Sequence, residues 1–116
     1  MKNKKIAIII RKSPFHDIRA TEAMRMGVGL TLRDIEVYVF FLEEGVEALI
    51  KRTEELTEEP DFLKHLTTLV ELKQTLVMGS DSADPIKDLD LIVETETWKK
   101  ESIFQFIAQC NGVVSV

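Results

Sequence analysis

The sequence predicts a single α/β domain built on a five-stranded parallel sheet with helices on both faces. Two observations support this prediction. Apolar, β-branched runs without polar alternation recur along the chain, as they do in strands that are covered on both faces. Segments with helical periodicity separate these runs, and parallel strands require such crossover connections. Because 45% of the 116 residues are hydrophobic, the chain can bury one core, and we expect one domain over residues 1–116.

The first part of the chain contains two predicted strands and one predicted helix. Residues 6–10 read Ile-Ala-Ile-Ile-Ile and form the first strand. Small and apolar residues recur at helical spacing over residues 20–31, with Asp17 as the candidate N-cap. Residues 35–42 form the second strand. Its side chains alternate between two faces, with Val37, Val39 and Phe41 on one and Tyr38, Phe40 and Leu42 on the other.

The rest of the chain continues the alternation of helices and strands. The predicted elements are a short helix over residues 45–52, a helix over 61–73, a third strand over 74–78, a weak fourth strand over 91–93, a helix over 100–109 and a last strand over 113–116. Residues 54–59 hold four carboxylates and are predicted to form a solvated connection. Residues 79–84 form a predicted loop, and a short helix is expected to begin at Pro85.

Composition argues against several classes of function. A net charge of −5 would repel phosphate backbones, so nucleic acid is not an expected ligand. No apolar run approaches the roughly 20 residues that cross a bilayer, so we expect no membrane contact. One cysteine and two histidines provide neither an internal disulfide nor a closed zinc site. We therefore expect a cytoplasmic protein and predict no cofactor, no metal ligand and no catalytic residue.

Two predicted loops meet at the carboxyl edge of the sheet, where ligands bind in open α/β folds. The candidate ligand-binding residues are Arg11, Lys12, Ser13 and His16 from the first loop, and Ser80, Asp81 and Ser82 from the second. Basic residues before a helix N-terminus can hold an anion, and a loop rich in carboxylates and hydroxyls offers oxygen ligands. The more common alternatives remain open for both loops: an ordinary polar loop, and a capped turn that starts a helix.

Four stretches, taken in order, carry a resemblance to a known family. Residues 4–10 read Lys-Lys-Ile-Ala-Ile-Ile-Ile, residues 19–27 read Arg-Ala-Thr-Glu-Ala-Met-Arg-Met-Gly, residues 37–46 read Val-Tyr-Val-Phe-Phe-Leu-Glu-Glu-Gly-Val, and residues 111–116 read Asn-Gly-Val-Val-Ser-Val. In this order they resemble the DsrE/DsrF-like family of sulfur-relay proteins. The resemblance implies a three-layer α/β/α sandwich, flavodoxin-like in appearance, on a five-stranded parallel sheet. It also implies assembly into homo- or hetero-oligomers with other DsrE-like subunits.

The resemblance also exposes a departure from the family pattern. Active members carry a persulfide on a cysteine in the loop after the third strand, where the thiolate is accessible. Here residues 79–83 read Gly-Ser-Asp-Ser-Ala, and a hydroxyl cannot hold transferable sulfur. Cys110 is either a relocated carrier or a buried apolar residue of the last helix. Its helical spacing from Ile103, Phe106 and Ile107 favours the buried role.

Two functional hypotheses follow from these observations. The first is a non-catalytic or regulatory member of the sulfur-relay family that acts through assembly, because the loop cysteine is absent. The alternative is a small anionic-ligand-binding or enzymatic α/β domain that uses the loops at residues 11–17 and 79–84. The missing thiol favours the hypothesis without enzymatic activity.

Overall fold

The computed structural model describes residues 4–13, 18–50 and 60–116. Its elements are β1 (Lys5–Ile10), α1 (Ile18–Thr31), β2 (Glu36–Phe41), the 3₁₀-helix η1 (Glu43–Leu49), α2 (Pro60–Glu71), β3 (Thr75–Gly79), α3 (Ser80–Ala83), the 3₁₀-turn η3 (Asp84–Ile86), β4 (Glu96–Trp98), α4 (Lys100–Ala108) and β5 (Gly112–Ser115). The predicted N-cap Asp17 and the acidic run at residues 54–59 lie outside the described residues.

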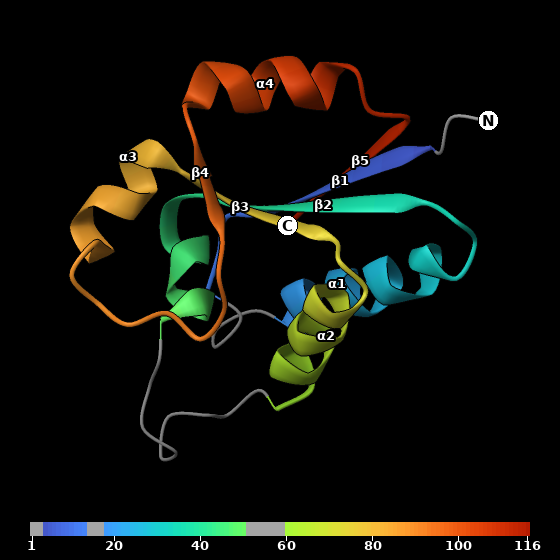
Figure 1. Ribbon diagram of the computed structural model, residues 1–116, viewed down its shortest axis with the longest axis horizontal. Helices are drawn as coiled ribbons and strands as arrows, with labels where there is room; N and C mark the ends of the chain where they lie inside the picture. The colour runs from blue at the N-terminus through green and yellow to red at the C-terminus, as the bar shows by residue number, and fades with distance from the viewer. Residues whose placement is uncertain (1–3, 14–17, 51–59) are drawn as a thin grey trace.

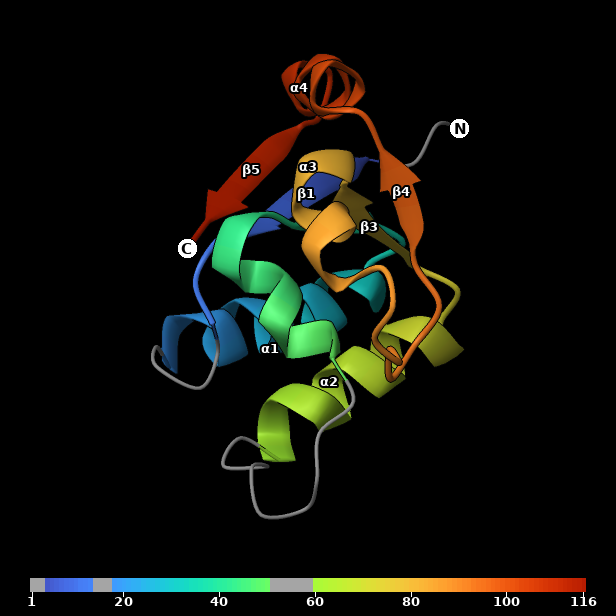
Figure 2. The ribbon, with the colours of Figure 1, turned by 90° about the vertical axis from the view of Figure 1, so that its left-hand side faces the viewer.

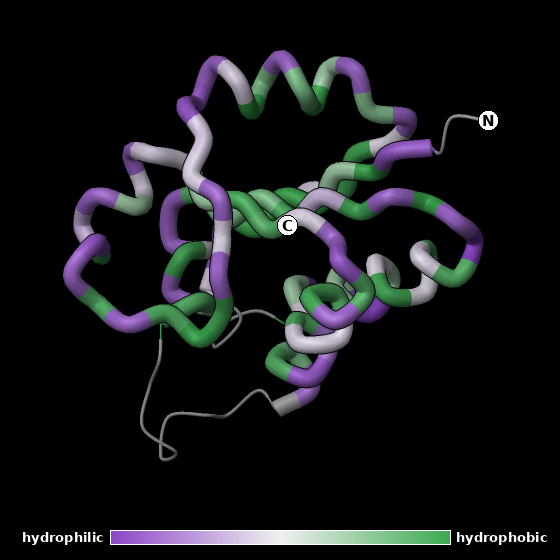
Figure 3. The backbone as a smooth tube through the Cα atoms, viewed as in Figure 1, coloured by the Kyte–Doolittle hydropathy of each residue, from purple (hydrophilic) through white to green (hydrophobic). Residues whose placement is uncertain are grey.

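The strands form one sheet in the order β4-β3-β2-β1-β5, and every neighbouring pair is parallel. This confirms the predicted five-stranded parallel sheet. Figure 1 shows the sheet at the centre, with α1 and α2 on one face and α4 on the other. The tube coloured by hydropathy shows the most hydrophobic backbone in the central strands of this middle layer (Figure 3). The chain is therefore an α/β/α sandwich.

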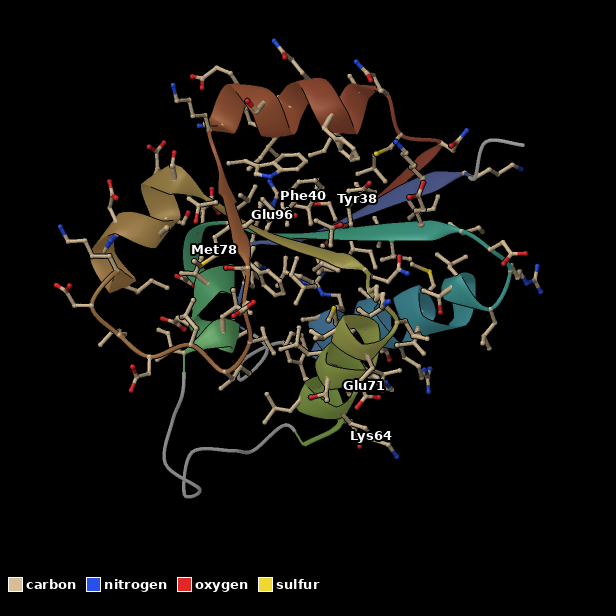
Figure 4. The ribbon with its side chains drawn as sticks, in the orientation of Figure 1. Tyr38, Phe40, Lys64, Glu71, Met78 and Glu96 are labelled. Atoms are coloured by element: carbon tan, nitrogen blue, oxygen red, sulfur yellow. The ribbon has the colours of Figure 1, made fainter. Side chains whose placement is uncertain are left out.

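β2 divides the core as its alternating pattern predicts. Val37, Val39 and Phe41 are fully buried in a cluster with residues of α1 and α2. Phe40 is buried on the opposite face, under α4. The Tyr38 ring lies 4.4 Å from the ring of Phe106 on α4, centroid to centroid. Figure 4 shows Tyr38 and Phe40 in the layer between the sheet and α4.

α2 covers the sheet with one stripe of apolar side chains. Its prediction rested on the four apolar residues Phe62, Leu66, Leu69 and Val70. The first three are buried in the core, which confirms the helical spacing. Val70, the fourth residue of that spacing, is 40% exposed. It follows Leu69 directly, and one residue turns a helix by about 100°, which carries Val70 away from the sheet.

The segment after β2 folds as a 3₁₀-helix rather than the predicted helix over residues 45–52. It begins at Glu43, whose φ of 52° lies in the left-handed region, and it ends at Leu49. A Cβ on Gly45 would lie 1.9 Å from the Ile10 carbonyl oxygen. Only glycine lets the helix approach the end of β1 this closely. This contact fixes where the chain turns after β2.

The segment after β3 differs from the predicted loop. α3 begins at Ser80, directly at the end of β3, and is followed by the 3₁₀-turn that contains Pro85. Proline stands in the first turn of η3, where its missing N–H costs no hydrogen bond. Pro85 therefore marks the start of a second short turn and not the start of the first helix.

The predicted fourth strand over residues 91–93 was wrong. The observed β4 lies five residues later and pairs with β3 through Val77↔Glu96 and Gly79↔Trp98. β4 is an edge strand, and Glu96 and Thr97 are exposed, which explains why it lacks an apolar run. Leu91 instead forms an isolated antiparallel bridge with Ile50. The apolar character of residues 91–93 serves packing beside η1, not pairing in the sheet.

Candidate functional site

A pocket of about 270 Å³ opens at the carboxyl edge of the sheet. Figure 2 shows this edge from the front, with α3 and the 3₁₀-helix that follows β2 lying before the strands. The pocket is lined by residues from the ends of three strands, from η1, from α3 and from the start of α4: Ile9, Arg11, Leu42, Glu43, Gly79, Ser80, Asp81, Ser82, Lys100, Ile103, Phe104 and Ser115. This is the edge at which open parallel sheets bind ligands.

Two hydrogen bonds fix the walls of the pocket. The Glu43 backbone N–H donates to Ser82 Oγ over 2.8 Å and joins the turn after β2 to α3. The Arg11 Nη2 donates to Ser115 Oγ over 2.9 Å and ties the end of β1 to the end of β5. Both bonds connect residues far apart in the sequence, so the shape of the pocket depends on the completed sheet.

Leu42, Ile103 and Phe104 form the apolar part of the pocket lining, which we call its base. Ile103 is buried, whereas Leu42 is only partly buried and Phe104 is 52% exposed. A Cβ on Gly79 would lie 2.9 Å from Leu42 Cδ2, so glycine at this position gives the Leu42 side chain its room. The Lys100 Nζ lies 5.7 Å from the centroid of the Phe104 ring, within range of a cation–π interaction. A ligand here would meet an apolar base with charged groups around it.

The structure brings four of the seven predicted ligand-binding residues together. Arg11, Ser80, Asp81 and Ser82 line the pocket. Lys12 is exposed and does not line it, and Ser13 is 1% exposed. His16 lies outside the described residues. The role of all seven residues in binding remains a prediction.

Sequence reasoning missed the contribution of α4. Lys100, Ile103 and Phe104 line the pocket because the first turns of α4 lie at the carboxyl edge. One signal was available, since a helix that follows a parallel strand must begin at that edge. The misplaced fourth strand concealed that signal. No sequence signal pointed to Glu43, because its backbone has a left-handed φ and the residue is not the glycine that usually marks such a conformation.

Comparison with known proteins identifies the family. The model of the DsrE/DsrF-like family matches residues 4–116. The chain belongs to the DsrE/DsrF-like family. A relative in the archaeon Methanocaldococcus jannaschii, the uncharacterized protein MJ0989, is 28% identical over 113 residues, which cover 96% of this chain and 98% of the relative. The resemblance carried by the four sequence stretches is thereby confirmed.

A solved structure shares the fold of this family member. The crystal structure of the YchN protein from E. coli superposes with a TM-score of 0.84 at 17% identity, and the match covers 97% of this chain and 99% of that one. At this level of identity the likeness establishes the fold alone. It agrees with the three-layer sandwich on a parallel sheet described above.

The pocket is lined by hydroxyl groups and contains no thiol. Ser80 and Ser82 follow β3 and line the pocket, and none of the residues that line it is cysteine. The sequence has one cysteine, Cys110. It follows α4 at the amino edge of the sheet, where the neighbouring Asn111 N–H donates to the Lys5 carbonyl oxygen. The length of β1, about 16 Å at roughly 3.3 Å per residue, separates this edge from the pocket.

The surroundings of Cys110 suit a structural residue. It packs against the cluster under α4, and its Sγ donates to the Phe106 carbonyl oxygen over 3.5 Å. Burial raises the pKa of the Cys110 thiol, and the nearby Lys5 ammonium offsets part of that rise. A raised pKa lowers the fraction of thiolate, which is the nucleophilic form. Cys110 is half-buried and lies two residues beyond the end of α4, so its predicted place within the helix was wrong, whereas its predicted packing beside Ile103, Phe106 and Ile107 agrees with these contacts.

Residues 4–13, 18–50 and 60–116 contain neither a candidate metal site nor a helix that could span a membrane. Within these ranges, histidine, cysteine and carboxylate side chains form no group of three or more that could hold a metal ion. The helices of the same ranges are too short or too polar to cross a membrane.

Proposed function

We propose that this chain is a non-catalytic member of the DsrE/DsrF-like family, which carries no sulfur and acts through non-covalent contacts in the cytoplasm. The observation that carries the proposal is the composition of the pocket. The segment after β3 presents the hydroxyls of Ser80 and Ser82, and the single cysteine lies at the other edge of the sheet. An alcohol is far less acidic than a thiol and does not hold sulfane sulfur.

The pocket supports the binding of a small ligand as one of these non-covalent contacts. It lies where open α/β sheets bind ligands and combines an apolar base with a few polar groups, as small-molecule sites commonly do. Covalent chemistry has less support. Ser82 Oγ accepts the Glu43 N–H, and no histidine among the described lining residues could take a proton from Ser80. A binding site explains the pocket without a nucleophile.

Transfer of sulfur from a cysteine desulfurase tests the proposal. The native chain and a Cys110→Ser variant are incubated with the desulfurase and L-cysteine, and the masses of both proteins are then measured. We expect neither protein to gain sulfur. Sulfur that is bound stably by the native chain and is absent from the variant would show that Cys110 is a relocated carrier, and would refute the proposal.

Assembly with other DsrE-like subunits is a second candidate contact. Several apolar side chains are exposed, among them Leu32 at 81% and Ile18 at 65%. Apolar side chains on a surface favour burial against a partner when they form a patch. Native mass spectrometry tests this: a defined oligomer that dissociates on Leu32→Glu supports it, and a monomer at micromolar concentration excludes self-assembly.

A further inference from the structure

The four charged residues that line the pocket are exposed and carry charges of both signs, and we call them the rim. Arg11 and Lys100 provide two cations, and Glu43 and Asp81 provide two carboxylates. Among the described residues these four groups form no ion pair with one another. Arg11 donates one of its five N–H groups to Ser115, and the Lys100 ammonium lies over the Phe104 ring with no carboxylate partner in the part of the chain that the structure describes. Each charge therefore retains capacity for a partner supplied by a ligand.

The base of the pocket suits a ligand that also has an apolar part. Leu42, Ile103 and Phe104 present apolar surface, and the volume is about 270 Å³. An apolar cavity of about 150 Å³ admits benzene, and sites for drug-sized ligands begin near 300 Å³. The pocket thus has room for a branched aliphatic or aromatic group together with a small charged head.

We propose that the pocket binds a zwitterionic metabolite with an apolar body, of the class of branched-chain and aromatic α-amino acids. The ligand's carboxylate pairs with Arg11 or Lys100, and its ammonium pairs with Glu43 or Asp81. Its side chain covers the base formed by Leu42, Ile103 and Phe104. This inference rests on the proposed function, because it assumes that the pocket holds its ligand non-covalently.

The balance of charge separates this ligand class from a simple anion. An anion with an apolar body would satisfy the cations and would be repelled by the two carboxylates. A cation with an apolar body would pair with the carboxylates and would be repelled by Arg11 and Lys100. Only a ligand with both charges compensates both pairs when it displaces water from the rim.

A set of matched ligands tests the inference by isothermal titration calorimetry on the native chain. L-leucine is compared with 4-methylpentanoate, which lacks the ammonium group, with 3-methylbutylamine, which lacks the carboxylate, and with L-alanine, which lacks the apolar body. L-phenylalanine is the aromatic probe. We expect leucine or phenylalanine to bind and each incomplete ligand to bind at least about tenfold more weakly, because each loses a charge-assisted hydrogen bond or the apolar contact.

A pair of variants tests whether Asp81 binds the ammonium group of the ligand. Asp81→Asn keeps the shape of the side chain and removes its charge. We expect it to weaken binding of the amino acid several-fold and to leave binding of 4-methylpentanoate equal or stronger. Asp84→Asn is the matched control, since Asp84 is exposed and does not line the pocket. We expect no change in either affinity.

Two results would overturn the inference. Equal binding of 4-methylpentanoate and leucine would make the pocket a site for anions. No binding of either amino acid would exclude the ligand class. Both results leave the absence of sulfur transfer intact, because that property is measured separately by protein mass. Sulfur on the native chain would instead refute the proposed function.

Discussion

The backbone N–H of Glu43 donates to the hydroxyl of Ser82 across 2.8 Å, and this bond joins the turn after β2 to the helix after β3. Glu43 has a left-handed φ of 52°, a conformation that is unfavourable for a side chain with a Cβ. The hydrogen bond helps to hold this conformation. Both residues line the pocket, so the bond also sets the position of one of its walls.

Ser82→Ala removes the acceptor of this bond. We expect the free energy of unfolding to fall by about 0.5–1 kcal/mol, because the bond is exposed to solvent and water can replace the hydroxyl in part. The fluorescence of Trp98, the only tryptophan, can follow unfolding in urea because the indole packs against Phe40 in the core under α4. The change should appear in the urea midpoint and not in the slope of the transition.

Ser80→Ala is the matched control for Ser82→Ala. The Ser80 side chain forms no hydrogen bond with the described residues, so its removal should change the free energy of unfolding by less than about 0.5 kcal/mol. Equal effects of the two substitutions would contradict a specific role for the bond between Glu43 and Ser82.

Gly45→Ala should destabilise the fold strongly. The added Cβ would lie 1.9 Å from the Ile10 carbonyl oxygen and 2.7 Å from its carbonyl carbon. Both atoms belong to the backbone of a central strand, so η1 must move away from the sheet. We expect a loss of about 2–4 kcal/mol in the free energy of unfolding, measured by urea denaturation.

Gly29→Ala is expected to stabilise the fold, in contrast to Gly45→Ala. Gly29 lies in α1, and nothing stands within 4 Å of an added Cβ. Alanine favours the helix, and the substitution should raise the free energy of unfolding by about 0.5–1 kcal/mol. A loss of stability at Gly29, or tolerance at Gly45, would contradict the packing described for these two glycines.

The sequence predicted the parts of the fold that depend on periodicity. A strand places alternate residues on opposite faces, so Val37, Val39 and Phe41 could be assigned to one cluster and Phe40 to the other. The same reasoning failed at β4. An edge strand is solvated, and its exposed Glu96 carries no periodic signal.

The pocket could be predicted in part for a related reason. The carboxyl ends of parallel strands share one edge, which brought Arg11 and Ser80 into the same prediction. The contributions of Lys100 and Phe104 depend on how the first turns of α4 pack beside that edge. This is set by the packing of Ile103 and Phe106 against the sheet and not by any local pattern.

Cys110 should react slowly with an alkylating reagent. Burial raises the pKa of its thiol in the folded chain, so at pH 8 the folded protein has less thiolate than the unfolded protein. Because the folded chain favours the neutral thiol, Cys110 contributes stability that is fully present below the ordinary thiol pKa. This stability is lost as the pH rises through the raised pKa. We expect iodoacetamide to label native protein several-fold more slowly than protein in urea, as measured by intact mass.

The pH dependence separates the pKa effect from simple shielding. The labelling rate of the native chain should still be rising at a pH where that of the unfolded chain has levelled off. A free-thiol peptide labelled in parallel corrects for the reagent. Native protein that labels as fast as unfolded protein at pH 8 would contradict an inert role for Cys110.

The most direct test of the central claim restores a thiol to the pocket. Ser80→Cys is made in the Cys110→Ser chain, and this protein and the native chain are incubated separately with a cysteine desulfurase and L-cysteine before mass measurement. We expect the thiolate introduced by Ser80→Cys to accept sulfane sulfur from the desulfurase persulfide, which is left as a thiol, and we expect the native chain to gain none. Stable sulfur on the native chain would contradict the claim that this family member carries no sulfur.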